Sequence, residues 1–178
     1  MKRATIRVAS LDPGVDATVL SRLASRLPPV FPARCRIETL ALDVDVAFLP
    51  ARNQYISSAL LAQMHRIPLT PGTHLLGITS LDLCVPVLTF VFGEAQLGGP
   101  CAIVSTHRLR DEFYGLPADG DRLGDRLLKE AIHEIGHTFG LRHCDNWACA
   151  MSSSHSVERL DYREAEFCSA CRAASGIK

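Results

Sequence analysis

The sequence has no excess of either charge and no long apolar run. Its 19 basic and 19 acidic side chains balance to a formal net charge of zero, which argues against a nucleic-acid partner or a polybasic contact with a membrane. No apolar run approaches the ~20 residues that a membrane-spanning helix needs. The basic start, Met1-Lys2-Arg3, precedes a short alternating segment that lacks the apolar core of a signal peptide. We therefore expect a cytoplasmic protein without a nucleic-acid or membrane partner.

The 178 residues, of which 47% are hydrophobic, are enough to build the core of one compact domain. Alternating apolar and polar residues predict five strands, at 4–11, 35–42, 74–85, 88–92 and 101–105. Apolar residues three and four positions apart predict helices, at 17–27, 52–65, 121–140 and about 157–165. Strands that alternate with helices, followed by one long helix, favour an α/β or α+β domain.

The long helix carries the sequence HEIGH at positions 133–137, followed by Gly140 and His143. Because residues four apart share a helix face, the imidazoles of His133 and His137 can reach one metal ion. Gly140 can adopt a positive φ and end the helix sharply, which returns His143 toward the same ion. The pattern predicts a Zn²⁺ site with three histidine ligands and a fourth position open for water. The alternative is a helix with ordinary surface histidines.

Glu134 directly follows the first of these histidines. Zinc lowers the pKa of a bound water toward ~7 and polarises the carbonyl of a scissile peptide bond. Glu134 is placed to accept the proton of that water as general base and to pass a proton to the leaving amine. The sequence therefore predicts a zinc-dependent peptidase that works without a covalent intermediate.

Four of the seven cysteines, Cys144, Cys149, Cys168 and Cys171, lie in the last quarter of the chain. An odd total cannot pair completely, and a chain without a secretion signal favours reduced thiols. Two close cysteine pairs separated by a loop are typical of a structural zinc site with four thiolate ligands. Two disulfides, four free thiols or a redox module are the alternatives. Because His143 and Cys144 are adjacent, we expect two zinc ions, one catalytic and one structural, on the order of 10 Å apart.

In these residues the chain resembles the metzincins, zinc metalloproteases with an elongated histidine motif and a Met-turn, and more narrowly the archaemetzincins. The narrower resemblance lies in the cysteine that follows His143, in Met151 two residues after Cys149, and in the terminal Cys-x2-Cys pair. Further segments resemble the family, at 90–99, 113–117 and 166–168.

The resemblance implies an α/β, metzincin-like fold with a twisted mixed sheet of about five strands, an active-site helix, a Met-turn and a C-terminal helix. Met151 would lie beneath the catalytic zinc. We expect a single metalloprotease domain over 1–178, with the sheet and the active-site helix in 1–140 and the four-cysteine site in a smaller subdomain, 141–178. The resemblance also implies that an edge strand near 88–92 forms the rim of the cleft, where a peptide substrate adds as a further strand.

One group found in many other metzincins is missing. They carry a tyrosine shortly after the methionine of the Met-turn, whereas serines at 152–154 follow Met151 here. Stabilisation of the oxyanion in the transition state is then left to zinc alone, or to His155, Tyr114 or a backbone amide. His65, His74 and His107 are not expected as metal ligands.

Charged residues on and after the long helix admit more than one interpretation. Asp161 either orients the C-terminal segment or accepts a hydrogen bond from a ligand histidine. The remaining charges are expected on the solvated face of the helix, at Arg122, Asp125, Arg126, Lys129 and Glu130.

Two functions from different classes fit these motifs. The first is a zinc metallopeptidase that acts on peptides, including the case of an aminopeptidase. The alternative is a catalytically weak, zinc-containing protein that binds peptides or regulates a partner, which the missing tyrosine favours. A peptide is the expected substrate, and the chain is expected to be a monomer.

Overall fold

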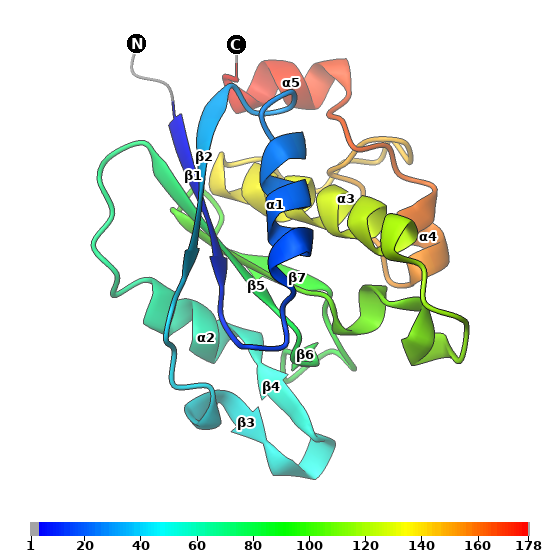
Figure 1. The fold of residues 1–178 in the computed structure, drawn as a ribbon. Coiled ribbons are helices and arrows are strands. Elements are labelled where there is room, and N and C mark those ends of the chain that lie inside the picture. Colours follow the sequence, from blue (N-terminus) through cyan, green and yellow to red (C-terminus); the bar gives the residue numbers. More distant parts are fainter. Residues whose placement is uncertain (1–3, 178) are drawn as a thin grey trace.

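A five-stranded sheet of mixed direction forms the centre of the computed structural model, which describes residues 4–177. Its strands are β1 (Ala4–Ser10), β2 (Ala33–Thr39), β5 (Thr73–Thr79), β7 (Gly93–Ala95) and β8 (Cys101–Ser105). They lie in the order β2-β1-β5-β8-β7, and all neighbours are parallel except β7 and β8, which are antiparallel. The mixed sheet with its helices confirms the predicted α/β fold (Figure 1).

Helices cover both faces of this sheet (Figure 1). The helices α1 (Ala17–Arg26) and α3 (Gly120–Thr138) pack on one face, and α2 (Ser57–Met64) packs on the other. Because side chains alternate along a strand, each inner strand supplies both apolar layers. One layer includes Ile6, Val8, Leu76, Ile78, Ala102 and Val104. The other includes Ala9, Leu75, Cys101 and Ile103.

A second, three-stranded sheet corrects two of the expected elements. It consists of β3 (Phe48–Leu49), β4 (Gln54–Ile56) and β6 (Leu83–Cys84), in the order β3-β4-β6. The helix expected over 52–65 starts only at Ser57, because the residues before it pair with β6. The strand expected over 74–85 ends at Thr79, because Asp12 accepts hydrogen bonds from the Thr79 hydroxyl and the Ser80 amide and the chain turns there.

The expectation of a strand over 88–92 is wrong. The edge strand is β7, which begins at Gly93. In the segment 88–92, side chains bind backbone carbonyls that a strand would use for hydrogen bonds to a neighbouring strand. Arg52 donates to the carbonyls of Leu88 and Thr89, and Gln54 donates to the Thr89 carbonyl as well.

Short elements complete the chain. Single 3-10 turns span Asp45–Ala47, Pro50–Arg52, His107–Leu109 and Asp111–Tyr114. After α3 come α4 (Val157–Asp161), shorter than the expected 157–165, and α5 (Ser169–Ser175), the C-terminal helix that the resemblance implied. Among residues 4–177, no helix has the length and apolar character required to cross a membrane.

Candidate metal centre and active site

Helix α3 carries the histidine motif, and the sequence defines both of its ends. The Asp119 carboxylate accepts hydrogen bonds from the amides of Asp121 and Arg122 and caps the first turn. At the other end Gly140 has φ +85°, a conformation that favours glycine, and its amide donates to the carbonyl of His137. The chain therefore turns sharply after the second histidine, as the motif predicts.

The structure brings the three predicted histidines together. The Nε2 atoms of His133 and His137 lie 3.1 Å apart. The ring of His143 lies 5.3 Å from that of His133 and 5.1 Å from that of His137, measured between centroids. One ring nitrogen from each residue lies within 4.8 Å of the others, so the group can hold a metal ion.

Backbone carbonyls orient the first two rings. A carbonyl only accepts, so the Nδ1 of His133 carries a proton and donates to Ala150 O at 2.8 Å, and the Nδ1 of His137 donates to Leu141 O at 2.7 Å. This tautomer leaves both Nε2 atoms unprotonated and facing each other, which is the arrangement of metal-binding histidines. Burial lowers the pKa of His133 well below its usual value and lowers that of His137. Both imidazoles are thus neutral, as metal coordination requires.

The four C-terminal cysteines form the second cluster, with their sulfur atoms within 4.8 Å of one another. No disulfide links them, and Cys144 Sγ lies 3.8 Å from Cys168 Sγ. Backbone amides point at the sulfurs: Cys149 Sγ accepts from the amides of Met151 and Cys168. Cys171 N–H donates to Cys168 Sγ and lowers the pKa of that thiol to about 7. The Cys171 amide therefore favours the thiolate, the form that binds metal, at Cys168, whereas burial raises the pKa of the Cys171 thiol.

The spacing of the donor atoms fits zinc at both clusters. Two thiolates bound at ~2.3 Å to a tetrahedral ion lie about 3.8 Å apart, which matches the distance between Cys144 and Cys168. Two imidazole nitrogens bound at ~2.0 to 2.1 Å lie about 3.3 Å apart, close to the 3.1 Å between His133 and His137. Three histidines leave a coordination position open, whereas four cysteines close the shell.

Glu134 is buried on α3, with 4% of its surface exposed. It lines a cavity of about 220 Å³ together with the segment 88–93, two of the three histidines, and residues 153–155. Burial raises the pKa of Glu134 well above its usual value, and the nearby carboxylate of Glu130 adds to this. A carboxyl group with a raised pKa beside a cluster that can hold a metal ion is suited to proton transfer.

Met151 packs against the helix that carries the first two histidines. Its side chain is fully buried, and its sulfur packs against Gly136, between the two histidines of α3. A β-carbon at position 136 would lie closer to the sulfur than real contacts allow, so the absence of a side chain there leaves room for the methionine. This contact links the loop after the third histidine to the helix that carries the first two.

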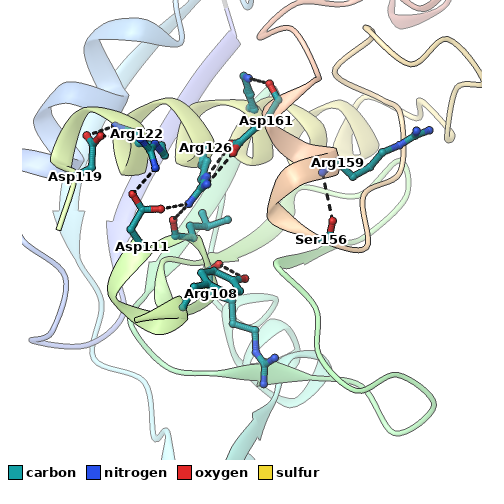
Figure 2. Close-up of polar contacts among 11 residues, drawn as sticks. Arg108, Asp111, Asp119, Arg122, Arg126, Ser156, Arg159 and Asp161 are labelled. Carbon is teal, nitrogen blue, oxygen red and sulfur yellow. Dashed lines mark hydrogen bonds and ion pairs between the residues drawn. The ribbon is translucent and has the colours of Figure 1, made fainter. Parts of the chain in front are cut away.

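The expectation that the charges of α3 lie on a solvated face is wrong for Arg126 and Glu130, each about 5% exposed. Arg126 donates two hydrogen bonds to Asp161 at 2.7 Å and one to Asp111 at 2.8 Å (Figure 2). Asp161 therefore orients the C-terminal segment, in agreement with one of the two expected roles. Sequence periodicity did not predict the burial of Arg126, because the residues that cover this side chain come from distant segments, α4 and the turn at 111–114.

The other side chains considered from the sequence lie at different distances from the histidine cluster and its cavity. His155 is exposed and lines the cavity beside Glu134. The hydroxyl of Tyr114 donates to the carbonyl of Arg108 at 2.9 Å and is not part of the cavity lining. His74 bonds Thr138 through Nδ1 and stacks on Phe139, outside the histidine cluster. A further residue, not anticipated from the sequence, contacts the cluster: Arg163, with an exposed fraction of 1%.

Comparison with known proteins agrees with this geometry. The model of peptidase family M54 matches residues 12–175. The chain is 40% identical over 158 residues to the archaemetzincin of Methanocaldococcus jannaschii, which covers 88% of this chain and 85% of that protein. It is 37% identical over 158 residues to the archaemetzincin of Archaeoglobus fulgidus, covering 88% and 91%.

Solved structures show the same fold. The crystal structure of archaemetzincin from Methanopyrus kandleri superposes with a TM-score of 0.86 at 30% identity, covering 97% of this chain and 93% of that one. The archaemetzincin of Archaeoglobus fulgidus, complexed with malonate, gives a TM-score of 0.81 at 34% identity, covering 96% and 99%. A zinc-dependent peptidase from Methanocorpusculum labreanum gives 0.86 at 31% identity, covering 96% and 100%.

The fold and the histidine cluster, together with these matches, define a zinc metallopeptidase. The chain belongs to peptidase family M54, and the curated relatives described above are archaemetzincins.

Proposed function

We propose that the chain hydrolyses peptide bonds at a zinc ion held by His133, His137 and His143, with Glu134 as general base. The observation that carries the proposal is the convergence of three ring nitrogens beside a buried carboxylate, all lining or adjoining one cavity. Bound zinc lowers the pKa of a water molecule and polarises the scissile carbonyl. Glu134 accepts the proton of the attacking water and later delivers a proton to the leaving amine.

The protonation behaviour of Glu134 suits both steps. Burial and Glu130 raise its pKa in the metal-free chain, whereas the positive charge of a bound ion favours the ionised form. A carboxylate under these opposing influences can take up a proton in one step and release it in the next. Gly93 leaves room for the Glu134 side chain at the edge of the cavity.

The segment 88–93 is the proposed docking edge for the peptide. Val91 N–H donates to Leu83 O, and Thr89 O accepts from Gln54, so alternate residues bind the body of the protein. Among residues 4–177 no backbone partner is assigned to Phe90, which lies between them and lines the cavity. A peptide can add along this edge through backbone hydrogen bonds, which support binding of extended substrates.

A second zinc ion is proposed at Cys144, Cys149, Cys168 and Cys171, in a structural role. The spacing of sulfurs and the amides directed at them support this assignment. Because Cys144 follows His143 directly, folding of the thiolate site fixes the chain that carries the third histidine.

The decisive test compares peptide hydrolysis by the zinc-loaded protein with that of Glu134→Gln, on a diverse peptide library, with zinc content measured for both. We expect equal zinc content and a loss of kcat of about 10² to 10⁴-fold in the variant. Absence of cleavage by the wild-type protein, or equal cleavage by both, would favour the alternative of a weak peptide-binding or regulatory protein. Peptides with free and blocked amino ends in the same library test the aminopeptidase hypothesis.

Three expectations from the sequence stay predictions: the cytoplasmic location, the monomeric state, and the division into subdomains 1–140 and 141–178. The absence of a nucleic-acid partner likewise rests on the charge balance alone.

A further inference from the structure

Arg163, two residues after α4, is the largest of the fully buried side chains, with 1% of its surface exposed. Its Nη1 donates to Ser152 O at 2.7 Å and to Ala150 O at 3.2 Å, the carbonyls on either side of Met151. Its Nη2 forms an ion pair with the Glu130 carboxylate. A buried charge is tolerated when such partners surround it, and these partners all belong to the structure around the histidine cluster.

One of these carbonyls also orients a histidine. Ala150 O accepts the Nδ1 proton of His133 at 2.8 Å, and Arg163 Nη1 lies 3.0 Å from that nitrogen. Since both groups carry protons, they do not bond each other; they share Ala150 O as acceptor. Arg163 thus holds in place the carbonyl that sets the direction and the tautomer of the His133 ring.

The other partner of Arg163 lies beside the proposed general base. Glu130 lies one helical turn before Glu134 on α3, and both side chains line the same cavity. Two carboxylates side by side in a buried site repel each other. The ion pair with Arg163 offsets the charge of Glu130 and fixes its side chain, which in turn restricts the position of Glu134.

We propose that Arg163 is a positioning residue for the peptidase reaction. It acts on the first zinc ligand through Ala150 O and on Glu134 through Glu130. This inference rests on the proposed function, because it takes His133 as a ligand and Glu134 as the base. The planar guanidinium reaches three acceptors at once, whereas the single ammonium group of a lysine cannot match that geometry.

The test uses Arg163→Lys, with Arg126→Lys as matched control. Arg126 is also buried in ion pairs but contacts Asp111 and Asp161, away from the cluster. Each protein is loaded with Co²⁺ to record its visible absorption spectrum. It is loaded with Zn²⁺ to measure the metal affinity, kcat and KM. All measurements are made well below the unfolding temperature of the variant. The thiolate-bound cobalt, with its own absorption, serves as an internal reference.

We expect Arg163→Lys to weaken metal binding at the histidines about 10 to 100-fold, to change the spectrum of the histidine-bound cobalt, and to lower kcat more than it changes KM. Arg126→Lys should lose stability but keep the wild-type spectrum and kcat. If Arg163→Lys matches wild type in affinity, spectrum and kcat, the inference is overturned while the proposed function stands. If the wild-type protein binds no metal at the histidines, the proposed function itself fails.

A second variant covers the case in which Arg163→Lys does not fold. Glu130→Gln keeps the shape of the side chain and leaves the bonds of Arg163 to the two carbonyls in place. We expect its histidine-bound cobalt spectrum to stay as in wild type while kcat falls at least 10-fold, because only the path to Glu134 is changed. An unchanged kcat in Glu130→Gln would contradict the coupling between Arg163 and the general base.

Discussion

Gly93, the first residue of β7, packs directly against the side chain of Glu134. A β-carbon at position 93 would lie 2.8 Å from Glu134 Oε1 and 2.7 Å from the carbonyl oxygen of Ile103. The backbone contact cannot yield, since β7 and β8 pair at this point. The close approach of a strand to the active-site helix therefore depends on glycine and fixes where the carboxylate can lie.

Gly93→Ala should displace Glu134 and lower kcat by about 10²-fold, since a shift on the order of 1 Å at a reacting group has that effect. Steady-state kinetics on the best library peptide measures it. Gly120→Ala is the control, because a β-carbon there meets nothing within 4 Å, and it should keep wild-type activity. Equal kcat in Gly93→Ala and wild type would show that Glu134 is not constrained by this contact.

Cys168→Ser should remove the structural zinc, so that the zinc content falls from two ions per chain toward one or none. Loss of a structural zinc destabilises the fold, and we expect Tm to fall by about 10 °C or more. Cys35→Ser, at a half-buried cysteine outside the cluster, should keep both ions. Metal analysis and thermal unfolding check this. A Cys168→Ser protein with full zinc content and unchanged Tm would contradict the four-thiolate site.

Arg126→Met should lower the free energy of unfolding by about 3 kcal/mol, because it removes the buried one of the two arginines that pair with the almost fully buried Asp111 and also releases Asp161 (Figure 2). Arg122 also pairs with Asp111, but its side chain is 49% exposed. Arg122→Met should therefore cost less than about 1 kcal/mol. Urea unfolding of both variants measures the two losses of free energy of unfolding. Equal losses would contradict the view that burial determines the strength of the ion pairs around Asp111.

Burial lowers the pKa of His74, which lies outside the metal clusters. Above its usual pKa of ~6.5 the imidazole is neutral in both the folded and the unfolded state, so it adds no pH dependence. Below that value the unfolded chain binds a proton that the folded chain resists, and the free energy of unfolding falls as the pH falls toward the lowered folded pKa. His74→Gln, which keeps a partner for Thr138, should lose less stability than wild type between pH 7.5 and 5.5. Equal losses in urea unfolding would refute this.

The two metal-binding clusters were easier to predict from the sequence than the segments and side chains that pack around them. The spacing of His133, His137, Gly140 and His143 determines the cluster locally, through helix geometry and one positive φ, so the residues suffice to predict it. The four cysteines are likewise recognisable by spacing alone. The main strands and α3 follow from hydrophobic periodicity.

Features that depend on distant partners were not predictable in this way. The segment 88–92 alternates like a strand, but Arg52 and Gln54, far away in the sequence, bind its carbonyls. The strands β4 and β6 are two or three residues long and carry no periodicity. Arg163 has the appearance of a surface residue in the sequence; its burial requires the turn around Met151 and the Glu130 side chain to meet around it.

The central claim is that two zinc ions bind at two neighbouring clusters, one of them with an open coordination position beside Glu134. Diffraction data from crystals of the zinc-loaded protein, collected on both sides of the zinc absorption edge, test it directly. The account predicts two anomalous peaks, one among the ring nitrogens of His133, His137 and His143 and one among the sulfurs of Cys144, Cys149, Cys168 and Cys171. Anomalous density at the cysteines alone, or at neither cluster, would contradict it.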